Sequence, residues 1–158
     1  MKIKTKHIPL LLLISIFGLV SCKSASLENA DMKILENLEK TENSTLILVV
    51  TEKMCSDCIH NELNNIQSHE KTQDNIIVIG LFSKKRHFYS FMNKFKSIKT
   101  IYINSEEINI LSRTAYYSLY NKEQKTLDYV FYADPCNSEK TYQYYFIMNK
   151  LLDNFEIK

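Results

Sequence analysis

The sequence has no hydrophobic run long enough to cross a membrane. The longest apolar stretch, residues 8–20, has about 13 residues, whereas a transmembrane helix needs roughly 20. The basic segment MKIKTKH precedes this stretch, and Ser21 and Cys22 follow it. The arrangement predicts a secretion signal over residues 1–21 that is removed from the mature chain.

An excess of one charge is also lacking. The chain has 20 basic and 18 acidic residues, and three of its lysines lie in residues 1–21. The mature chain then has 17 basic and 18 acidic residues, a net charge near −1. This balance gives no support to a nucleic-acid partner, which calls for a basic surface. The remaining residues suffice for one domain, expected at 27–158.

The residues LVSC, at positions 19–22, resemble the lipobox of bacterial lipoproteins. The resemblance implies cleavage before Cys22, acyl chains on the new N-terminal cysteine and a lipidated tether over residues 22–26. It implies a place in the bacterial cell envelope, anchored to a membrane and facing the periplasm or the cell surface. An ordinary cleaved signal with an incidental cysteine, or an uncleaved hydrophobic anchor, is the alternative.

Apolar runs typical of strands buried on both faces alternate with segments of helical periodicity. The expected strands are residues 45–51, 75–82, 98–104, 114–120 and 126–132. The expected helices are a lead-in helix within 27–40, helices from Ser56 and Lys84, a helical turn at 105–111, and a closing helix. The closing helix is expected to bury a stripe of Tyr144, Ile147, Met148, Leu151 and Phe155. A parallel β-α-β unit followed by a hairpin predicts an α/β domain with a mixed sheet.

Cys55 and Cys58 lie where the first expected strand ends and the first expected helix begins. A thiol attacks a disulfide as its thiolate, and the N-terminus of a helix stabilises negative charge. Two intervening residues bring the second thiol within reach of the first. The pattern therefore favours a redox-active dithiol over an inert or structural pair.

The sequence lacks the partners that other cysteine sites need. A structural zinc site commonly has a second CxxC or an HxxxH, and neither is present. A c-type haem attachment has histidine directly after the second cysteine, where this chain has Ile59. Cys136 stands alone, and we expect it to be a bystander. No cofactor and no resident metal are therefore expected.

The order β-α-β-α-β-β-α, with CxxC after the first strand, resembles the thioredoxin-like fold, a three-layer arrangement with a mixed central sheet. With LVSC and the lead-in helix, the chain is similar to the thioredoxin-like (redoxin-domain) lipoproteins of bacterial envelopes. The resemblance covers roughly residues 46–155. It implies that Cys55 attacks, that Cys58 resolves, and that Thr114 and Ala115 lie beside the bound substrate. The implied partners are envelope proteins that carry thiols or disulfides.

Several residues depart from the thioredoxin pattern. The motif is Met-Cys-Ser-Asp-Cys instead of Trp-Cys-Gly-Pro-Cys, and Asp57 places an anion beside the thiolate. Val49 stands where thioredoxin has a buried acid. Ala115 stands at the usual cis-proline place, and the Thr114–Ala115 peptide is expected to be trans because a non-proline cis bond costs about 2.5–4 kcal/mol.

These departures leave two alternatives to a thiol-disulfide oxidoreductase. One is a non-catalytic thioredoxin-like binding module that docks a partner on an aromatic face. The other is a copper- or zinc-handling relative, in which both cysteines and a distant histidine such as His87 hold the metal.

Overall fold

The computed structural model describes residues 25–69, 75–106, 108, 114–134 and 138–156. Its helices are α2 (Ala25–Leu38), α3 (Ser56–Gln67), α5 (Lys85–Met92) and α6 (Ser138–Glu156). Its strands are β1 (Thr45–Thr51), β2 (Ile76–Phe82), β3 (Lys99–Asn104), β4 (Tyr116–Asn121) and β5 (Thr126–Tyr132). The predicted strands all form, within two residues of the expected bounds. The helical turn expected at 105–111 lies largely outside the described residues.

The five strands form one mixed sheet in the order β3-β2-β1-β4-β5. Strand β1 is central and pairs in parallel with β2 and antiparallel with β4. Strand β3 extends the parallel half, and β5 completes the antiparallel hairpin. The predicted α/β class with a mixed sheet is confirmed. The sheet contains the five strands expected from the apolar runs, one more than the four strands in the order β-α-β-α-β-β-α.

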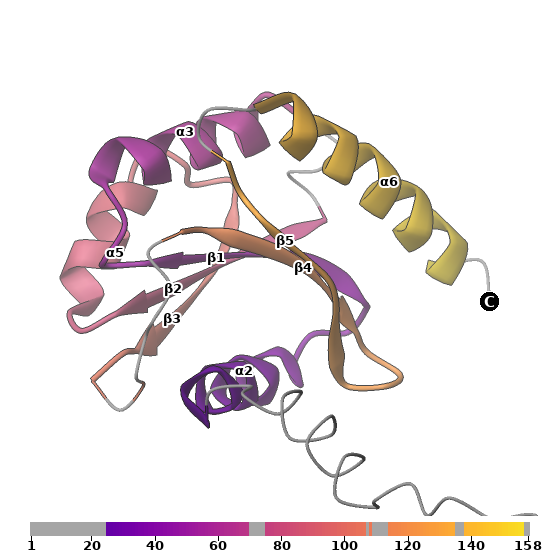
Figure 1. The fold of residues 1–158 in the computed structure, drawn as a ribbon, viewed down its shortest axis with the longest axis horizontal. Coiled ribbons are helices and arrows are strands. Elements are labelled where there is room, and N and C mark those ends of the chain that lie inside the picture. Colours follow the sequence, from indigo (N-terminus) through magenta and orange to yellow (C-terminus); the bar gives the residue numbers. More distant parts are fainter. Residues whose placement is uncertain (1–24, 70–74, 107, 109–113, 135–137, 157–158) are drawn as a thin grey trace, which may run out of the picture.

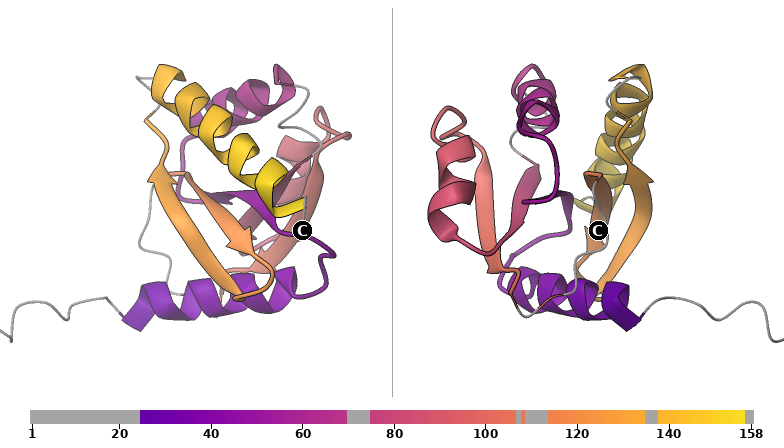
Figure 2. Two further views of the ribbon diagram at one scale, coloured as in Figure 1. Left: turned by 90° about the vertical axis from the view of Figure 1, so that its right-hand side faces the viewer. Right: turned by 60° about the vertical axis from the view of Figure 1, so that its left-hand side comes forward.

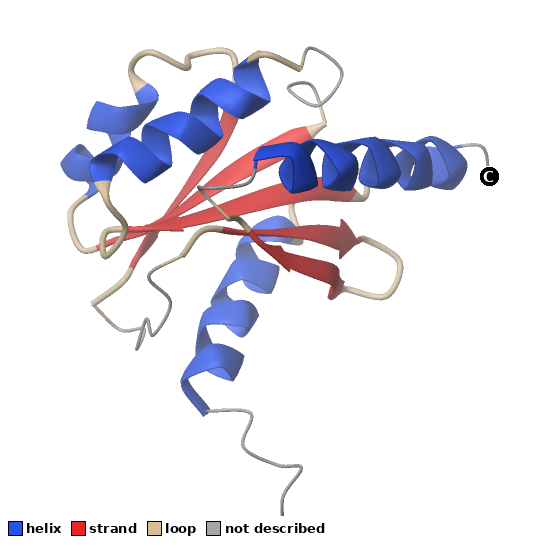
Figure 3. Ribbon diagram, turned by 45° about the horizontal axis from the view of Figure 1, so that its top comes forward, coloured by secondary structure: helices blue, strands red, loops and turns tan. Residues whose placement is uncertain are grey.

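Helices cover both faces of the sheet (Figure 1, Figure 2). Helices α3, α5 and α6 pack on one face, where the larger core cluster lies, and α2 packs on the other. Along β1, Leu46 and Leu48 point into the larger cluster, and Ile47 and Val49 point into the cluster under α2. Both faces of β1 are therefore buried, which explains its uninterrupted apolar sequence. The result is a thioredoxin-like three-layer fold (Figure 3).

The closing helix α6 buries a face different from the predicted stripe. Tyr144 and Met148 are buried as expected, but Ile147 is 54% exposed. Tyr145 is buried instead, and its hydroxyl donates a hydrogen bond to the Tyr117 hydroxyl inside the core. The side chain of Phe155 lies outside the described part of the chain. The inclusion of Ile147 in the buried stripe was wrong.

Helix α5 packs closely on β2 because Gly80 has no side chain. Gly80 lies in the middle of β2, and the ring of Phe88 from α5 occupies the space that a Cβ atom would take. Phe88 is fully buried and contacts Phe82 at 5.6 Å between ring centroids. The ring therefore has little room in which to move.

We expect Gly80→Ala to destabilise the protein by about 1–3 kcal/mol, the usual cost of overpacking a core. Urea unfolding followed by circular dichroism measures the change. In a protein that already carries Phe88→Leu, Gly80→Ala should cost less stability than it does in the wild type, since the clash involves the Phe88 ring. A Gly80→Ala protein as stable as the wild type would contradict this account of the packing.

Candidate functional site

The two cysteines of the motif lie at the carboxyl end of the central strand. After β1 ends, the Met54 N–H bonds to the carbonyl of Thr51, and α3 begins directly after Cys55. Cys55 is the N-cap residue, with extended backbone angles. Its Sγ accepts a hydrogen bond from the backbone N–H of Cys58 at 3.0 Å. The first cysteine therefore lies where the helix dipole and free N–H groups favour negative charge.

Cys55 and Cys58 form a disulfide, with their Cα atoms 5.2 Å apart. Cys55 is exposed, whereas Cys58 is half-buried and packs against the larger core cluster. Only one of the two sulfur-bearing residues is thus freely open to an approaching molecule. Asp57 is exposed in the first turn of α3, where it interacts favourably with the helix dipole but repels a thiolate on Cys55.

Thr114 and Ala115 lead into β4, the antiparallel neighbour of β1. Ala115 is only 1% exposed and belongs to the core cluster that Cys58 contacts. Its carbonyl accepts a hydrogen bond of 2.9 Å from the N–H of Ala133. No cis peptide bond occurs among the described residues, so the Thr114–Ala115 peptide is trans, as predicted.

Sequence reasoning missed one ionisable residue of this region, Glu62. It lies on α3, one turn beyond Cys58, and is only 3% exposed. The Tyr117 hydroxyl from β4 donates a hydrogen bond to the Glu62 carboxylate, and the Tyr145 hydroxyl from α6 donates to Tyr117 at 2.7 Å. Three elements thus meet at one buried carboxyl group.

Burial raises the pKa of Glu62 above its ordinary value of 4.5, and hydrogen bonds from Tyr117 and Asn65 offset part of this effect. Burial is also the main cause that raises the pKa values of the Tyr117 and Tyr145 hydroxyls. Both tyrosines are therefore neutral donors at physiological pH. The proton that titrates in this network is the one on Glu62.

A signal for Glu62 was present in the sequence. It falls among Ile59, Leu63 and Ile66, which form the apolar stripe of α3. An acid inside such a stripe is either paired or functional, since an unpaired buried charge is costly. The thioredoxin pattern directs attention instead to position 49, where Val49 faces the cluster under α2.

Glu52, the acid nearest the motif on the β1 side, has a structural role. Its carboxylate accepts hydrogen bonds from the backbone N–H and hydroxyl of Ser83, at 2.9 and 2.7 Å, and from the hydroxyl of Ser105 at 3.3 Å. These bonds to Ser83 and Ser105 hold the pKa of Glu52 below its ordinary value. The residue ties together the ends of β1, β2 and β3.

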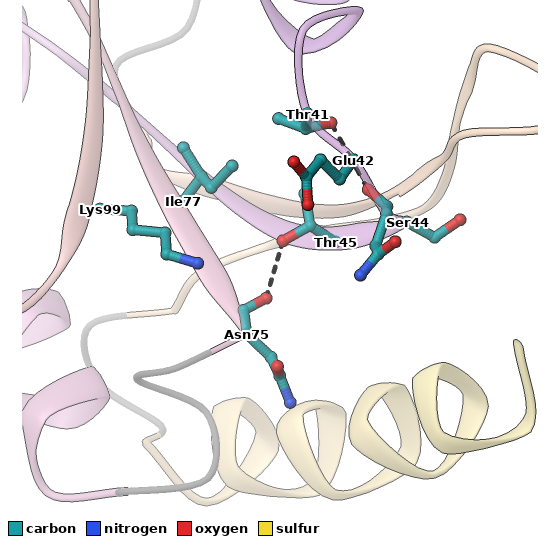
Figure 4. Close-up of a pocket in the computed structure, with 8 residues that line it drawn as sticks. Thr41, Glu42, Ser44, Thr45, Asn75, Ile77 and Lys99 are labelled. Carbon is teal, nitrogen blue, oxygen red and sulfur yellow. Dashed lines mark hydrogen bonds between the residues drawn. The ribbon is translucent and has the colours of Figure 1, made fainter. Parts of the chain in front are cut away.

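A surface pocket of about 330 Å³ lies at the end of the parallel strands that is opposite to the cysteines (Figure 4). It is lined by residues 41–44, which precede β1, and by the amino ends of β1, β2 and β3. Thr45 connects β1 to the start of β2 by donating a hydrogen bond to the carbonyl of Asn75 at 2.9 Å. None of the residues predicted for the functional site lines it.

Within the described ranges, no group of three or more histidine, cysteine or acidic residues is placed to hold a metal ion. No helix in the same ranges has the length and apolar character needed to span a membrane.

Comparison with protein-family models, with curated proteins and with solved structures finds no match to this chain. The class is therefore defined by the structure alone. The chain is a thioredoxin-like α/β protein with a CxxC disulfide at the start of the helix that follows the central strand.

The raised pKa of Glu62 predicts a pH dependence of stability. As the pH rises, the unfolded chain loses this proton near pH 4.5, and the folded protein loses it at a higher pH. The stability that is fully present below pH 4.5 is therefore lost as the pH rises through the pKa of the folded protein. Glu62→Gln removes the titration and keeps an acceptor for Tyr117. Relative to the wild type, this variant should therefore gain unfolding free energy as the pH rises from 4 to 8. The gain should be about 1.4 kcal/mol for every tenfold difference in the proton affinity of Glu62 between the folded and the unfolded chain.

Urea unfolding at several pH values measures this difference. Glu123→Gln, which replaces an exposed acid between β4 and β5, is the matched control. A Glu62→Gln difference that stays constant from pH 4 to 8 would contradict the assignment.

Proposed function

We propose that the protein is a lipid-anchored thiol-disulfide oxidoreductase of the bacterial cell envelope. The observation that supports this proposal best is the Cys55–Cys58 disulfide, whose first residue is exposed at the N-cap of α3. This position combines access to substrate with stabilisation of a thiolate. The substrates are envelope proteins that carry thiols or disulfides.

In the reduced protein, the Cys55 thiolate attacks a disulfide of the substrate. A mixed disulfide forms, and the first substrate sulfur leaves as a thiolate. Cys58 then attacks the Cys55 sulfur, the bond to the substrate breaks, and the second substrate sulfur leaves. Two electrons pass from the cysteine pair to the substrate, and the same steps in reverse oxidise a substrate dithiol. The greater burial of Cys58 suits it to the second, internal attack.

The substrate chain is proposed to pass beside Thr114 and Ala115. Ala115 shares a core cluster with the residues that contact Cys58, which supports this placement. The trans peptide between the two residues presents a backbone different from that of a cis-proline protein. We therefore expect substrate preferences that differ from those of thioredoxin itself.

A binding module without redox activity is the second candidate function. It is favoured by the exposed apolar side chains on β5 and α6: Tyr129, Val130, Tyr132, Phe146 and Ile147. Strand β5 is also an edge of the sheet. Such an edge can pair with an extended segment of a partner.

We expect Cys58→Ser to trap substrates, because Cys55 can still attack but no thiol resolves the mixed disulfide. Non-reducing gels of cells that express this variant should show covalent adducts that disappear on reduction. Adding Cys55→Ser should abolish them, and adding Cys136→Ser should leave them unchanged. A Cys58→Ser protein that traps nothing would favour the binding-module function.

The lipid anchor predicts that Cys22 is the mature N-terminus. Intact-mass analysis of the native protein should show cleavage after Ser21 and a mass increase equal to that of several acyl chains, since one acyl chain gives only marginal membrane binding. Cys22→Ala should lack this increase and leave the membrane fraction. An unmodified Cys22, or an N-terminus elsewhere, would contradict the anchor.

A further inference from the structure

The balanced total charge of the chain hides a strong separation of charge along the sequence. Residues 75–105 contain six basic residues and no acidic one, whereas the rest of the expected mature chain, within residues 22–158, has 11 basic and 18 acidic residues. One segment therefore carries a formal charge of +6 and the remainder a formal charge of −7. The six basic side chains are all exposed: Lys84, Lys85, Arg86, Lys94, Lys96 and Lys99.

Three of these residues, Lys84, Lys85 and Arg86, form a basic cluster at the same end of the sheet as the cysteines. The carboxylate of Glu52, three residues before Cys55, accepts two hydrogen bonds from Ser83, and the cluster follows Ser83 directly. Helices α3 and α5 also lie next to each other (Figure 1), with an aromatic contact between them at 5.5 Å. The first turn of α5 thus borders the end of β1 from which the motif starts.

The basic cluster has no explanation in the stability of α5. Lys84 is the N-cap residue, its side chain makes no capping hydrogen bond, and the first turn contains no acidic residue. Positive charge at this end of a helix opposes the helix dipole. Lys85 packs over the ring of Tyr89, with its Nζ 5.7 Å from the ring centroid. Among the described residues, no acidic side chain forms an ion pair with the cluster. Its charge is therefore available to a group from another molecule.

The acidic residues at this end of the sheet point to other partners. Glu52 is held by two serines, as described above, and the Glu106 carboxylate accepts a hydrogen bond from the Asn104 amide at 3.4 Å. Asp57 is exposed on α3, the helix that carries the motif. A partner that approaches Cys55 along α5 therefore meets exposed amines and a guanidinium group.

We propose that the basic cluster binds carboxylates of the substrate protein, and so selects substrates whose disulfide lies beside acidic residues. The inference rests on the proposed function and names the class of substrate. The acidic segment contacts the cluster before Cys55 attacks, and no bond forms or breaks in this contact. Attraction between opposite charges raises the rate of productive encounter, an effect that salt screens.

The position of the cluster favours a protein substrate over an anionic lipid surface. A substrate disulfide has to reach Cys55, so the residues that flank this disulfide come to lie beside the first turn of α5. A bilayer pressed against the same turn would also cover Cys55. The basic residues Lys94 and Lys96 lie at the other end of α5, toward the amino end of β3, and offer a matched control.

Rates of reduction of three disulfide peptides test the proposal. The peptides share one sequence with an intramolecular disulfide, and three positions beside it are all Glu, all Gln or all Lys. The full-length protein carries Cys22→Ala and Cys136→Ser, so that Cys55 and Cys58 are its only cysteines. Chromatography of the reduced peptide gives the second-order rate constant at about 0.01 M salt, where the Debye length is about 30 Å. Variants are compared on the same peptide, so the intrinsic reactivity of each peptide cancels.

We expect Lys84→Ser with Lys85→Ser to slow reduction of the Glu peptide about 10-fold, because the local attraction for an anionic substrate is lost. Reduction of the Gln peptide should stay within about twofold of the wild type, since it carries no charge beside the disulfide. Lys94→Ser with Lys96→Ser removes the same charge from the far end of α5 and should leave both rates within about twofold. At about 1 M salt, where the Debye length is about 3 Å, the difference between wild type and Lys84→Ser with Lys85→Ser should disappear.

Charge reversal gives a result that a structural role of the lysines would not produce. With Lys84→Glu and Lys85→Glu, reduction of the Glu peptide should slow further, and reduction of the Lys peptide should become faster than in the wild type.

Equal effects of the two lysine pairs, equal losses on the Glu and Gln peptides, or insensitivity to salt would overturn the proposal. Binding to phosphatidylglycerol vesicles that requires Lys84 and Lys85, with unchanged peptide rates in their variant, would overturn it too and assign the cluster to lipid headgroups. A wild-type protein that reduces none of the peptides would instead refute the proposed function, and the inference with it.

Discussion

The burial of β1 on both faces is the constraint on which the rest of the structure depends. This strand pairs with β2 and β4, and its side chains enter both core clusters. Because β1 is paired with a strand on each side and packed against a core cluster on each face, the residues at its carboxyl end have a defined position. Cys55 follows that end after a short turn, so the N-terminus of α3 and the disulfide are placed by the central strand of the sheet.

The site combines groups that act on charge in opposite ways. The dipole of α3 and the Cys58 N–H stabilise a thiolate on Cys55, while Asp57 opposes it from an exposed position. On the inner face of the same helix, burial raises the pKa of Glu62, so this carboxyl keeps its proton to a higher pH than an exposed glutamate does. The N-cap of one short helix thus places an exposed cysteine sulfur where negative charge is favoured, and the inner face of the helix holds a buried carboxyl where negative charge is disfavoured. That division matches an outer attack followed by an internal one.

The network that holds Glu62 also links the two halves of the domain. Its carboxyl belongs to α3 in the parallel half, whereas Tyr117 lies in β4 and Tyr145 in the closing helix. The stacking of Phe131 on Tyr144, with ring centroids 5.0 Å apart, brings α6 onto the hairpin and so helps to place Tyr145. Loss of this packing would therefore affect the surroundings of the cysteines as well as the stability of the hairpin.

The local features of this protein were determined by the sequence itself. The strand and helix positions, the placement of CxxC at the start of α3 and the burial of β1 follow from side-chain periodicity and helix capping, which act between near neighbours. Tertiary structure decided the rest. Tyr145 and Ile147 are two positions apart and point to nearly opposite sides of α6, and the packing of Tyr144 on Phe131 and of Tyr145 on Tyr117 decides that Tyr145 is the buried one. The pairing of Glu62 with Tyr117 joins residues 55 positions apart. It exists only because the register of β4 against β1 brings that hydroxyl under α3, and periodicity along a single segment carries no information about such a register.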